Sequence, residues 1–221
     1  MAELVPLQTT HEWVRGRLRQ AILDGDYKPG DPLKQTELAA RLQVSVTPVR
    51  EAMRDLASEG LVVLDPQRVA RVRDLNAKEA GEVAAIRELL EPLAAQLAAQ
   101  HAEPEQIERI RALADESAAS VTDAEYLDSN RRFHMAVIAA ANAPVLAGIL
   151  SNLRLISSMY LASAVRIAGG TRDKSKREHL DLAEAIAAHD EEAARRIMTA
   201  HLLPSRVVMT SIAGDAAEGT A

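Results

Sequence analysis

The chain has 221 residues, of which 41 are alanine and five are aromatic, with a net charge of −6 and no cysteine. The lack of cysteine excludes disulfides, thiolate catalysis, iron–sulfur clusters and cysteine-based zinc sites, and the few aromatic residues argue against an all-β sandwich or barrel. No run of ~18 uncharged apolar residues and no signal-like start is present, so we expect a cytoplasmic protein with no membrane partner.

The net charge is divided unevenly along the chain. Residues 1–75 contain 11 Lys or Arg and 11 Asp or Glu, whereas residues 76–221 contain 15 and 21 and account for the whole −6. The pattern changes at the same point, from short helical segments with Pro/Gly turns to long alanine-rich stretches. We predict a first domain over 1–75, a second over 76–213 and a disordered tail over 214–221. The overall acidity does not exclude DNA, because nucleic-acid binding depends on local fields.

Three helices are expected in the first domain. Apolar residues recur at helical spacing over about 10–24 and again over 36–42. Residues 43–45 then form a turn, and a third helix opens with Thr47 as its N-cap and Pro48 as its first helical residue. Two helices joined by such a short turn are typical of a helix-turn-helix motif.

The third helix presents two arginines, and a basic hairpin follows it. Arg50 and Arg54 are one turn apart and lie off the apolar stripe, where a recognition helix meets phosphates or guanine edges. Residues 61–73 alternate as two short strands around a turn at 65–68, which predicts a wing with a basic tip and return strand. Each feature alone also fits a solvated helix face or an ordinary hairpin. Their order favours a winged helix-turn-helix that binds DNA.

The second domain is predicted to be an all-α antiparallel bundle of about six helices, so the protein is mainly α-helical. The expected helices span 77–101, 104–119, 123–141, 144–167, 174–188 and 191–212. Pro92 lies inside the first of them and is expected to kink it, because proline cannot donate an interior hydrogen bond. Such a bundle commonly holds a site among its inward-facing side chains.

Three histidines and one asparagine form a candidate site in this bundle. His134 follows Asn130 by one helical turn, so the two share a helix face. His179 and His201 flank the turn at 189–190 at equal distances of ~16 Å, so a helical hairpin would place them level. Three imidazoles and an amide oxygen can together hold a transition metal such as zinc. The alternative for each histidine is an ordinary hydrogen-bonded or solvent-facing side chain.

The first domain resembles the winged-helix domain of GntR-family transcription regulators. The resemblance is carried by Val44-Ser45-Val46-Thr47-Pro48-Val49-Arg50-Glu51-Ala52-Met53, by Gly60-Leu61 and by the preceding Pro29-Gly30. It implies contacts with double-stranded operator DNA through Gln35, Thr36, Val46, Thr47, Arg50, Arg54 and Arg68. Two positions depart from the family pattern. Val46 replaces a common arginine and can contact a thymine methyl but cannot donate a hydrogen bond, and Val69 replaces a wing glycine, which affects how deeply the wing inserts.

The second domain resembles the FCD effector-binding domain of the FadR-like branch. The matching residues are Phe133-His134, Asn142, Glu178-His179-Leu180, His189-Asp190 and His201. Many members hold a divalent metal through three histidines and an aspartate, which implies the ligands Asn130, His134, His179 and His201. Asn130 occupies the aspartate position, and Asp128 is a poor substitute because it lies about 120° around the helix from His134.

Two arginines are candidate effector contacts. Arg87 matches an arginine that points into the cavity in related proteins, and Arg154 is a second candidate. The alternative for Arg87 is a surface ion pair with Glu91, four residues later.

These features predict a ligand-responsive transcription regulator and not an enzyme. We expect a homodimeric repressor on a pseudo-palindromic operator, released by a small carboxylate effector at a zinc, nickel or manganese ion in the bundle. A neutral asparagine leaves the metal charge less compensated, which favours an anionic effector. One alternative is a regulator that senses the metal itself. Another is a metal-dependent hydrolase, which is disfavoured because no glutamate has the HExxH-type spacing of a general base.

Overall fold

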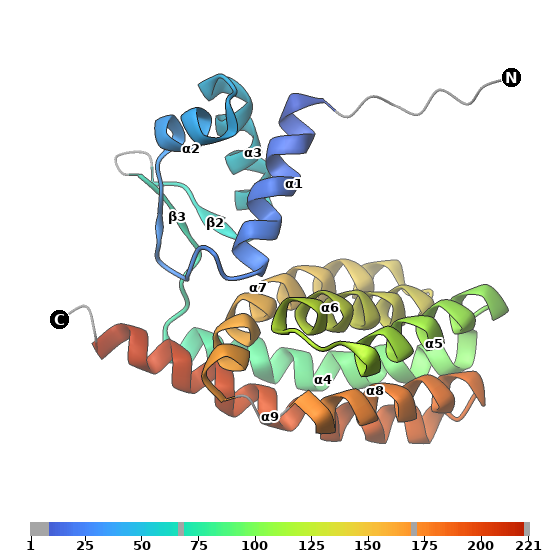
Figure 1. The fold of residues 1–221 in the computed structure, drawn as a ribbon. Helices are drawn as coiled ribbons and strands as arrows, with labels where there is room; N and C mark the ends of the chain where they lie inside the picture. The colour runs from blue at the N-terminus through green and yellow to red at the C-terminus, as the bar shows by residue number, and fades with distance from the viewer. Residues whose placement is uncertain (1–8, 66–68, 169–171, 219–221) are drawn as a thin grey trace, which may run out of the picture. The chain divides into compact units, whose positions relative to one another are not determined.

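The structure is a computed structural model that describes residues 9–65, 69–168 and 172–218 (Figure 1). The chain divides into two compact units, Met1–Asp74 and Leu75–Ala221. Both are built mainly from helices, as predicted. The first adds a small antiparallel sheet, and the second is a helical bundle.

The first unit is a winged helix-turn-helix. Its elements are α1 (Thr10–Leu23), β1 (Pro32–Leu33), α2 (Gln35–Leu42), α3 (Val46–Ser58), β2 (Val62–Val63) and β3 (Ala70–Val72). The predicted hairpin is confirmed, since Val62 pairs with Val72 in antiparallel register. The sequence did not indicate β1, which adds to the other side of β3. Buried side chains of the helices and the sheet form the core; the largest are Leu18, Ile22, Leu33, Met53, Leu56 and Leu61.

The start of α3 lies two residues earlier than predicted. Gln43 adopts a left-handed conformation (φ 55°) and ends α2, and Ser45 is extended at the N-cap position of α3. The helix therefore begins at Val46, and Thr47 lies inside its first turn rather than at its N-cap. The geometry of the turn, more than the hydroxyl of Thr47, determines where the helix begins.

The second unit contains six helices in its described residues. They are α4 (Ala77–His101), α5 (Pro104–Ala119), α6 (Asp123–Ala140), α7 (Pro144–Ala168), α8 (Arg172–Ala187) and α9 (Glu191–Glu218). Figure 1 shows α4 and α9 side by side along the bundle, and their packing is the most extensive between any two helices. Capping boxes at Asn76 and Thr122 begin α4 and α6, and α4 continues through Pro92 as one helix.

The predicted disordered tail is wrong for residues 214–218. Helix α9 continues through Gly214 to Glu218. A glycine costs only about 1 kcal/mol relative to alanine inside a helix, and the buried Ala213 just before it holds this part of α9 against the bundle. Residues 219–221 lie outside the described residues.

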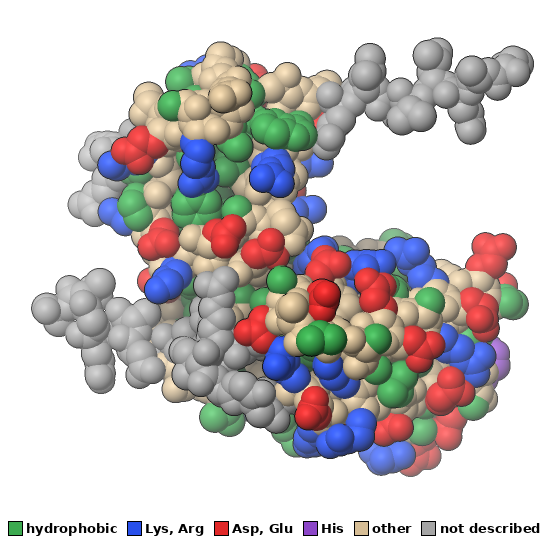
Figure 2. All heavy atoms as spheres, in the orientation of Figure 1, with side chains coloured by type: hydrophobic (Ala, Val, Ile, Leu, Met, Phe, Trp, Pro, Cys, Tyr) green, Lys and Arg blue, Asp and Glu red, His purple; other side chains and the backbone are tan. Residues whose placement is uncertain are grey.

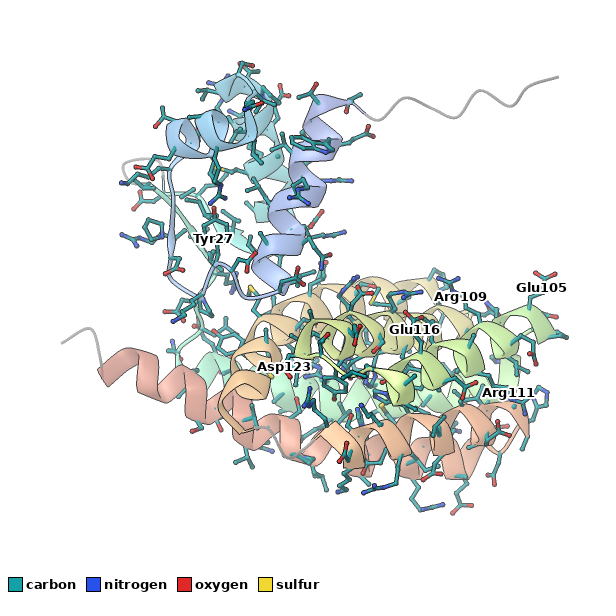
Figure 3. The ribbon with its side chains drawn as sticks, in the orientation of Figure 1. Tyr27, Glu105, Arg109, Arg111, Glu116 and Asp123 are labelled. Atoms are coloured by element: carbon teal, nitrogen blue, oxygen red, sulfur yellow. The ribbon has the colours of Figure 1, made fainter. Side chains whose placement is uncertain are left out.

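Alanine-rich packing and ion pairs between helices hold the bundle together. The fully buried Ala94, Ala95, Ala98 and Ala99 allow neighbouring helices to approach α4 closely. Across the surface, the Arg111 side chain of α5 donates twice to Glu184 of α8, with both N–O distances at 2.9 Å (Figure 3). Acidic and basic side chains alternate over the visible face of this unit (Figure 2).

One stretch of the described residues, Pro144–Ala162 of α7, is long and apolar enough to cross a membrane. The core helix of a bundle meets the same criterion, and α7 packs against α4, α6 and α9. Its Arg154 is buried against Glu91 of α4. Packing inside the bundle thus accounts for part of the apolar composition of α7.

Candidate functional site

Three imidazoles from three helices meet inside the bundle. A ring nitrogen of His134 on α6, one of His179 on α8 and one of His201 on α9 all lie within 4.8 Å of one another. The Nε2 atoms of His134 and His201 are 3.1 Å apart. The ring centroids of His179 and His201 are 5.0 Å apart, so the α8–α9 hairpin has the register that the sequence predicts.

The Nδ1 atom of each imidazole faces an oxygen on the side away from the cluster. Ser117 Oγ lies 3.0 Å from Nδ1 of the α8 histidine, and Glu178 Oε2 lies 2.9 Å from that of the α9 histidine. Glu91 Oε2 is the nearest such oxygen to Nδ1 of the α6 histidine, but at 3.6 Å it is beyond hydrogen-bond distance, and this nitrogen has no hydrogen-bond partner among the described residues. When Nδ1–H points to such an acceptor, the lone pair of Nε2 is directed to the opposite side, as in histidine metal ligands.

Burial keeps two of the imidazoles neutral. His134 and His179 are each 1% exposed. Burial, with nearby positive charge, holds the pKa of both imidazoles well below the ordinary histidine value. His179 Nε2 is buried and has no hydrogen-bond partner within the described part of the chain. A metal ion would satisfy this nitrogen, because a neutral imidazole is the ligand form that binds metals.

The spacing of one pair of nitrogens also fits a metal. Ligands at a zinc–nitrogen distance of about 2.0–2.1 Å lie roughly 3.3 Å apart in a tetrahedral site and roughly 2.9 Å apart in an octahedral one. The 3.1 Å between the Nε2 atoms of His134 and His201 falls between these values. Three histidines from α6, α8 and α9 therefore form a donor set that suits a divalent transition metal.

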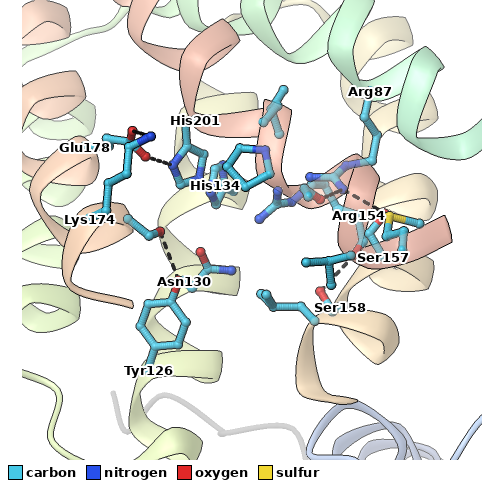
Figure 4. Close-up of a pocket in the computed structure, with 17 residues that line it drawn as sticks. Arg87, Tyr126, Asn130, His134, Arg154, Ser157, Ser158, Lys174, Glu178 and His201 are labelled. Carbon is cyan, nitrogen blue, oxygen red and sulfur yellow. Dashed lines mark hydrogen bonds and ion pairs between the residues drawn. The ribbon is translucent and has the colours of Figure 1, made fainter. Parts of the chain in front are cut away.

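Asn130 lies beside the cluster, as the helical spacing predicts. Its side chain is buried and lines the cavity next to His134 (Figure 4). Asp128 faces elsewhere: its side chain is 37% exposed and pairs with Arg131 and Arg132. The carboxylate of Asp128 thus does not replace the one that the FCD pattern has at Asn130.

A cavity of about 240 Å³ opens beside the histidines. Its polar lining comprises Arg87, Tyr126, Asn130, His134, Arg154, Ser157, Ser158, Lys174, Ser175, Glu178, His201 and Ser205, and its apolar lining is Leu161, Leu202, Pro204, Val208 and Met209. Figure 4 shows the imidazoles of His134 and His201 between Glu178 on one side and the two arginines on the other. The cavity thus places Asn130, His134 and His201 beside two buried arginines, whereas His179 does not line it.

Both predicted arginines line this cavity, and one buried carboxylate joins them. Arg87 Nε is 2.6 Å from Glu91 Oε1, and Arg154 Nη1 is 3.3 Å from Glu91 Oε2. All three side chains are buried, so the pair of Arg87 and Glu91 is not the surface ion pair of the alternative interpretation. Burial alone would raise the pKa of Glu91, but Arg154 and Arg87 outweigh it and lower that pKa.

The arginine–glutamate group has a surplus of one positive charge. Burial lowers the pKa of Arg154 to about 10, which still leaves the guanidinium charged at neutral pH. Two buried cations therefore share one carboxylate beside the cavity. A buried charge without a compensating opposite charge is energetically unfavourable. An anionic ligand in this cavity would compensate the surplus positive charge and would therefore bind more favourably.

The sequence did not assign a role to Glu91 or Ser117. The spacing of Arg87 and Glu91 indicated an ion pair, but their burial depends on how α4 crosses α6 and α7. Ser117 lies at the end of α5, and its place beside the α8 histidine has no signal in the sequence. Glu178 was part of the family resemblance, although its contact with His201 follows only from the α8–α9 packing.

Most of the predicted DNA-binding residues are exposed on the first unit. On α3, Val46, Thr47, Arg50 and Arg54 are exposed, while at the start of α2 Thr36 is exposed and Gln35 is partly buried. Neither arginine of α3 is paired with a carboxylate among the described residues of this unit. Arg68 lies outside the described residues.

Other arginines of the first unit are held in ion pairs. Arg15 lies 3.6 Å from Asp55, and Arg19 lies 2.7 Å from Glu59, which joins α1 to the rear of α3. Arg15 and Arg19 thus stabilise the domain through ion pairs. Arg50 and Arg54, which have no such partner among the described residues, remain available to contact a phosphate backbone.

Comparison with known proteins identifies both units. The family of bacterial regulatory proteins called gntR matches residues 10–72, and the FCD domain matches residues 82–203. A probable D-xylose utilization operon transcriptional repressor of Paenarthrobacter nicotinovorans is 31% identical over 88% of this chain and 86% of its own length. The HTH-type transcriptional regulator McbR of Escherichia coli is 30% identical over 84% of this chain and 86% of its own.

A solved structure titled E. coli McbR/YncC has the same fold, with a TM-score of 0.80 over 93% of this chain and 99% of that one, at 23% identity. The matching families and relatives are transcription regulators and not enzymes, which removes the hydrolase alternative. The chain therefore belongs to the GntR family of DNA-binding transcription regulators, in the FadR-like branch that carries an FCD domain.

Proposed function

We propose that this regulator is a homodimeric repressor whose operator affinity is lowered by a small carboxylate bound at a divalent metal ion. The metal, zinc in the first instance with nickel or manganese as alternatives, would be held by Asn130, His134, His179 and His201. The observation that carries the proposal is the convergence of three imidazoles, two of which have Nδ1 hydrogen-bonded to an oxygen outside the cluster. The bound metal would act as a Lewis acid that attracts the anionic end of the effector.

The charges around the cavity support an anionic effector. Asn130 and the histidines are neutral ligands, so they leave the charge of a divalent ion uncompensated. Arg87 and Arg154 add two buried cations and are balanced by Glu91 alone. A carboxylate in the cavity would approach both the metal and the surplus positive charge, and a bidentate contact with a guanidinium is geometrically favourable.

An exposed apolar surface supports a homodimer. Ile86, Leu89 and Leu93 lie on α4 with exposed fractions from 41% to 75%, and Leu203 and Val207 of the neighbouring α9 are 59% and 69% exposed. Exposed apolar residues on two helices that pack together mark a candidate protein interface. A two-fold dimer would present two α3 helices to successive major grooves of a pseudo-palindromic operator.

The experiment is calorimetry on the metal-loaded and chelated protein. Native mass spectrometry establishes metal content, and a panel of small mono-, di- and tricarboxylates is then titrated into each form. We expect at least one carboxylate to bind the loaded protein and none to bind after chelation. Carboxylate binding that persists unchanged after confirmed metal loss would contradict the proposed site.

Two histidine substitutions test whether metal retention depends on the cluster itself rather than on the loss of any histidine. His201→Ala removes one ligand of the cluster and should abolish metal retention. His101→Gln alters an exposed histidine at the end of α4 and should leave metal retention unchanged. Operator titration by fluorescence anisotropy with the metal, with and without the bound carboxylate, distinguishes effector sensing from a regulator that senses metal alone.

A further inference from the structure

Helix α7 lines the cavity with one continuous stripe. Arg154, Ser157, Ser158 and Leu161 all line it, and their spacing of i, i+3, i+4 and i+7 is one face of a helix. Arg154 also contacts Glu91 of α4. A ligand that fills the cavity therefore rests against α7 along two helical turns.

A tyrosine on the flank of the same helix holds the start of the second unit. Tyr160 lies between Ser158 and Leu161 and is 1% exposed. Its hydroxyl oxygen accepts a hydrogen bond from the backbone N–H of Leu75 at 2.6 Å and lies 3.5 Å from the carbonyl oxygen of Leu75, to which it donates. One side chain of α7 thus binds both polar groups of a residue far away in the chain.

The chain between this contact and the winged domain is very short. Leu75 is the first residue of the second unit, and Asp74 is the last of the first. Arg73 donates its backbone N–H to the carbonyl oxygen of Leu61 at 2.8 Å, which ties it to the winged domain. Asp74 is therefore the only residue between the backbone held by the winged domain and the backbone held by Tyr160.

We propose that Tyr160 is the positioning residue that couples the effector cavity to the winged domain. This rests on the proposed function, in which occupancy of the cavity changes operator affinity. A shift of α7 against the ligand moves the Tyr160 hydroxyl, and the hydroxyl moves the backbone of Leu75. Because only Asp74 separates Leu75 from the backbone held by the winged domain, the displacement reaches that domain. Because coupling between sites is reciprocal, operator binding must also act on α7.

The test uses that reciprocity and needs no effector. Hydrogen exchange of the full-length protein is followed by mass spectrometry over residues 153–162, with and without an operator duplex selected from random sequences. Operator binding fixes the winged domain and Leu75, so in the wild type exchange in this part of α7 should slow. In Tyr160→Phe, which keeps the ring and loses the hydroxyl, we expect this slowing to fall about 2- to 30-fold.

The matched control is Ser151→Ala. Its hydroxyl donates to the Ala147 carbonyl oxygen within α7 and has no contact with the linker, so the operator-induced slowing should match the wild type. A second variant inserts Gly-Ser between Asp74 and Leu75, keeps the Tyr160 contact and lengthens the connection. In this variant the operator-induced slowing of hydrogen exchange in α7 should also disappear. If Tyr160→Phe does not fold, this variant alone tests the coupling.

The outcomes separate this inference from the proposed metal site. Equal slowing in the wild type and both variants, or no slowing in the wild type, overturns the role of Tyr160. Titration of Zn²⁺ into the same proteins by calorimetry should give wild-type affinity in Tyr160→Phe. If Zn²⁺ binds none of them, the metal site fails, while the exchange result still decides the coupling.

Discussion

At the scale of single residues, Asn130 determines the charge of the candidate metal site. It is buried one helical turn before His134, in the position where the FCD pattern has an aspartate. The amide oxygen is a neutral ligand, so all four side chains of the set contribute no charge. The metal and the effector are therefore expected to depend on this position in opposite ways.

Asn130→Asp should strengthen metal binding and weaken anion binding. The added carboxylate neutralises part of the metal charge, so zinc affinity should rise about tenfold or more, while a carboxylate effector loses attraction. Calorimetry of zinc and then of the carboxylate measures both changes, with Asn130→Ala as the control that lacks an oxygen ligand. A gain in affinity for both ligands would contradict this charge argument.

The buried histidines should make the metal-free protein sensitive to acid. The pKa of His134 and of His179 is held well below the ordinary value of 6.5 by burial. Below about pH 6.5 the unfolded chain binds protons that the folded chain does not, so stability is complete above that pH and falls as the pH decreases. Each imidazole contributes a slope of at most about 1.4 kcal/mol per pH unit.

Urea unfolding in the presence of a chelator, at pH 7.5, 6.5 and 5.5, measures this slope. The carboxylates titrate at lower pH and contribute little in this window. His179→Gln should flatten the dependence because it removes one of the two groups. A stability that does not change between pH 6.5 and 5.5 would show that the imidazoles are protonated in the folded protein.

At the scale of elements, α3 has one face buried in the domain core and another that is exposed, which is the face expected to contact DNA. Val49, Ala52, Met53 and Leu56 are fully buried, whereas Arg50 is exposed and has no carboxylate partner in the described part of the domain. Helix α1 packs across the inner face and pairs Arg19 with Glu59 at the end of α3. Arg50 and Arg19 are therefore expected to have different roles.

Arg50→Ala should weaken operator binding about tenfold or more. If Arg50 contacts a phosphate, the dependence of affinity on salt should also fall by about one counterion. Arg19→Ala is the matched control, since it removes an arginine from the same domain at an ion pair and should leave operator affinity nearly unchanged. Anisotropy titrations over a range of salt test both variants, and equal losses would contradict the assignment.

The helices were largely predictable because their ends are chemically marked. Proline and Asn or Thr caps begin α4, α5 and α6 at the expected residues, and Gly25 and Gly60 follow the ends of α1 and α3. Two features were not predictable. Strand β1 is two residues long, too short to show alternation, and helix α9 passes a glycine that alone favours an end.

At the scale of the whole molecule, the apolar surface of α4 and α9 should control assembly. Val207→Glu places a charge among exposed apolar side chains, so we expect a monomer in native mass spectrometry and a large loss of operator affinity. Val145→Glu is the control, because Val145 of α7 is 79% exposed and lies outside this surface. If both variants remain dimeric, the dimer uses another face.

Part of the candidate site was predictable because two of its histidines lie on one helical hairpin. His179 and His201 could be matched because a hairpin sets its own register, and their ring centroids are indeed close. The contacts of Glu91 beyond its own helix could not be predicted, because they depend on how α4 packs against α6 and α7. Its contacts with Arg154 and His134 exist only once these helices are packed together.

The neutral ligand set around Asn130 would make the regulator respond to two signals jointly. With no carboxylate among the four ligands, an anion bound in the cavity strengthens metal binding, and the metal strengthens anion binding by the same factor. Neither signal alone would fill the site at low concentration. The regulator would then leave the operator only when the metal and the carboxylate are both present in the cell.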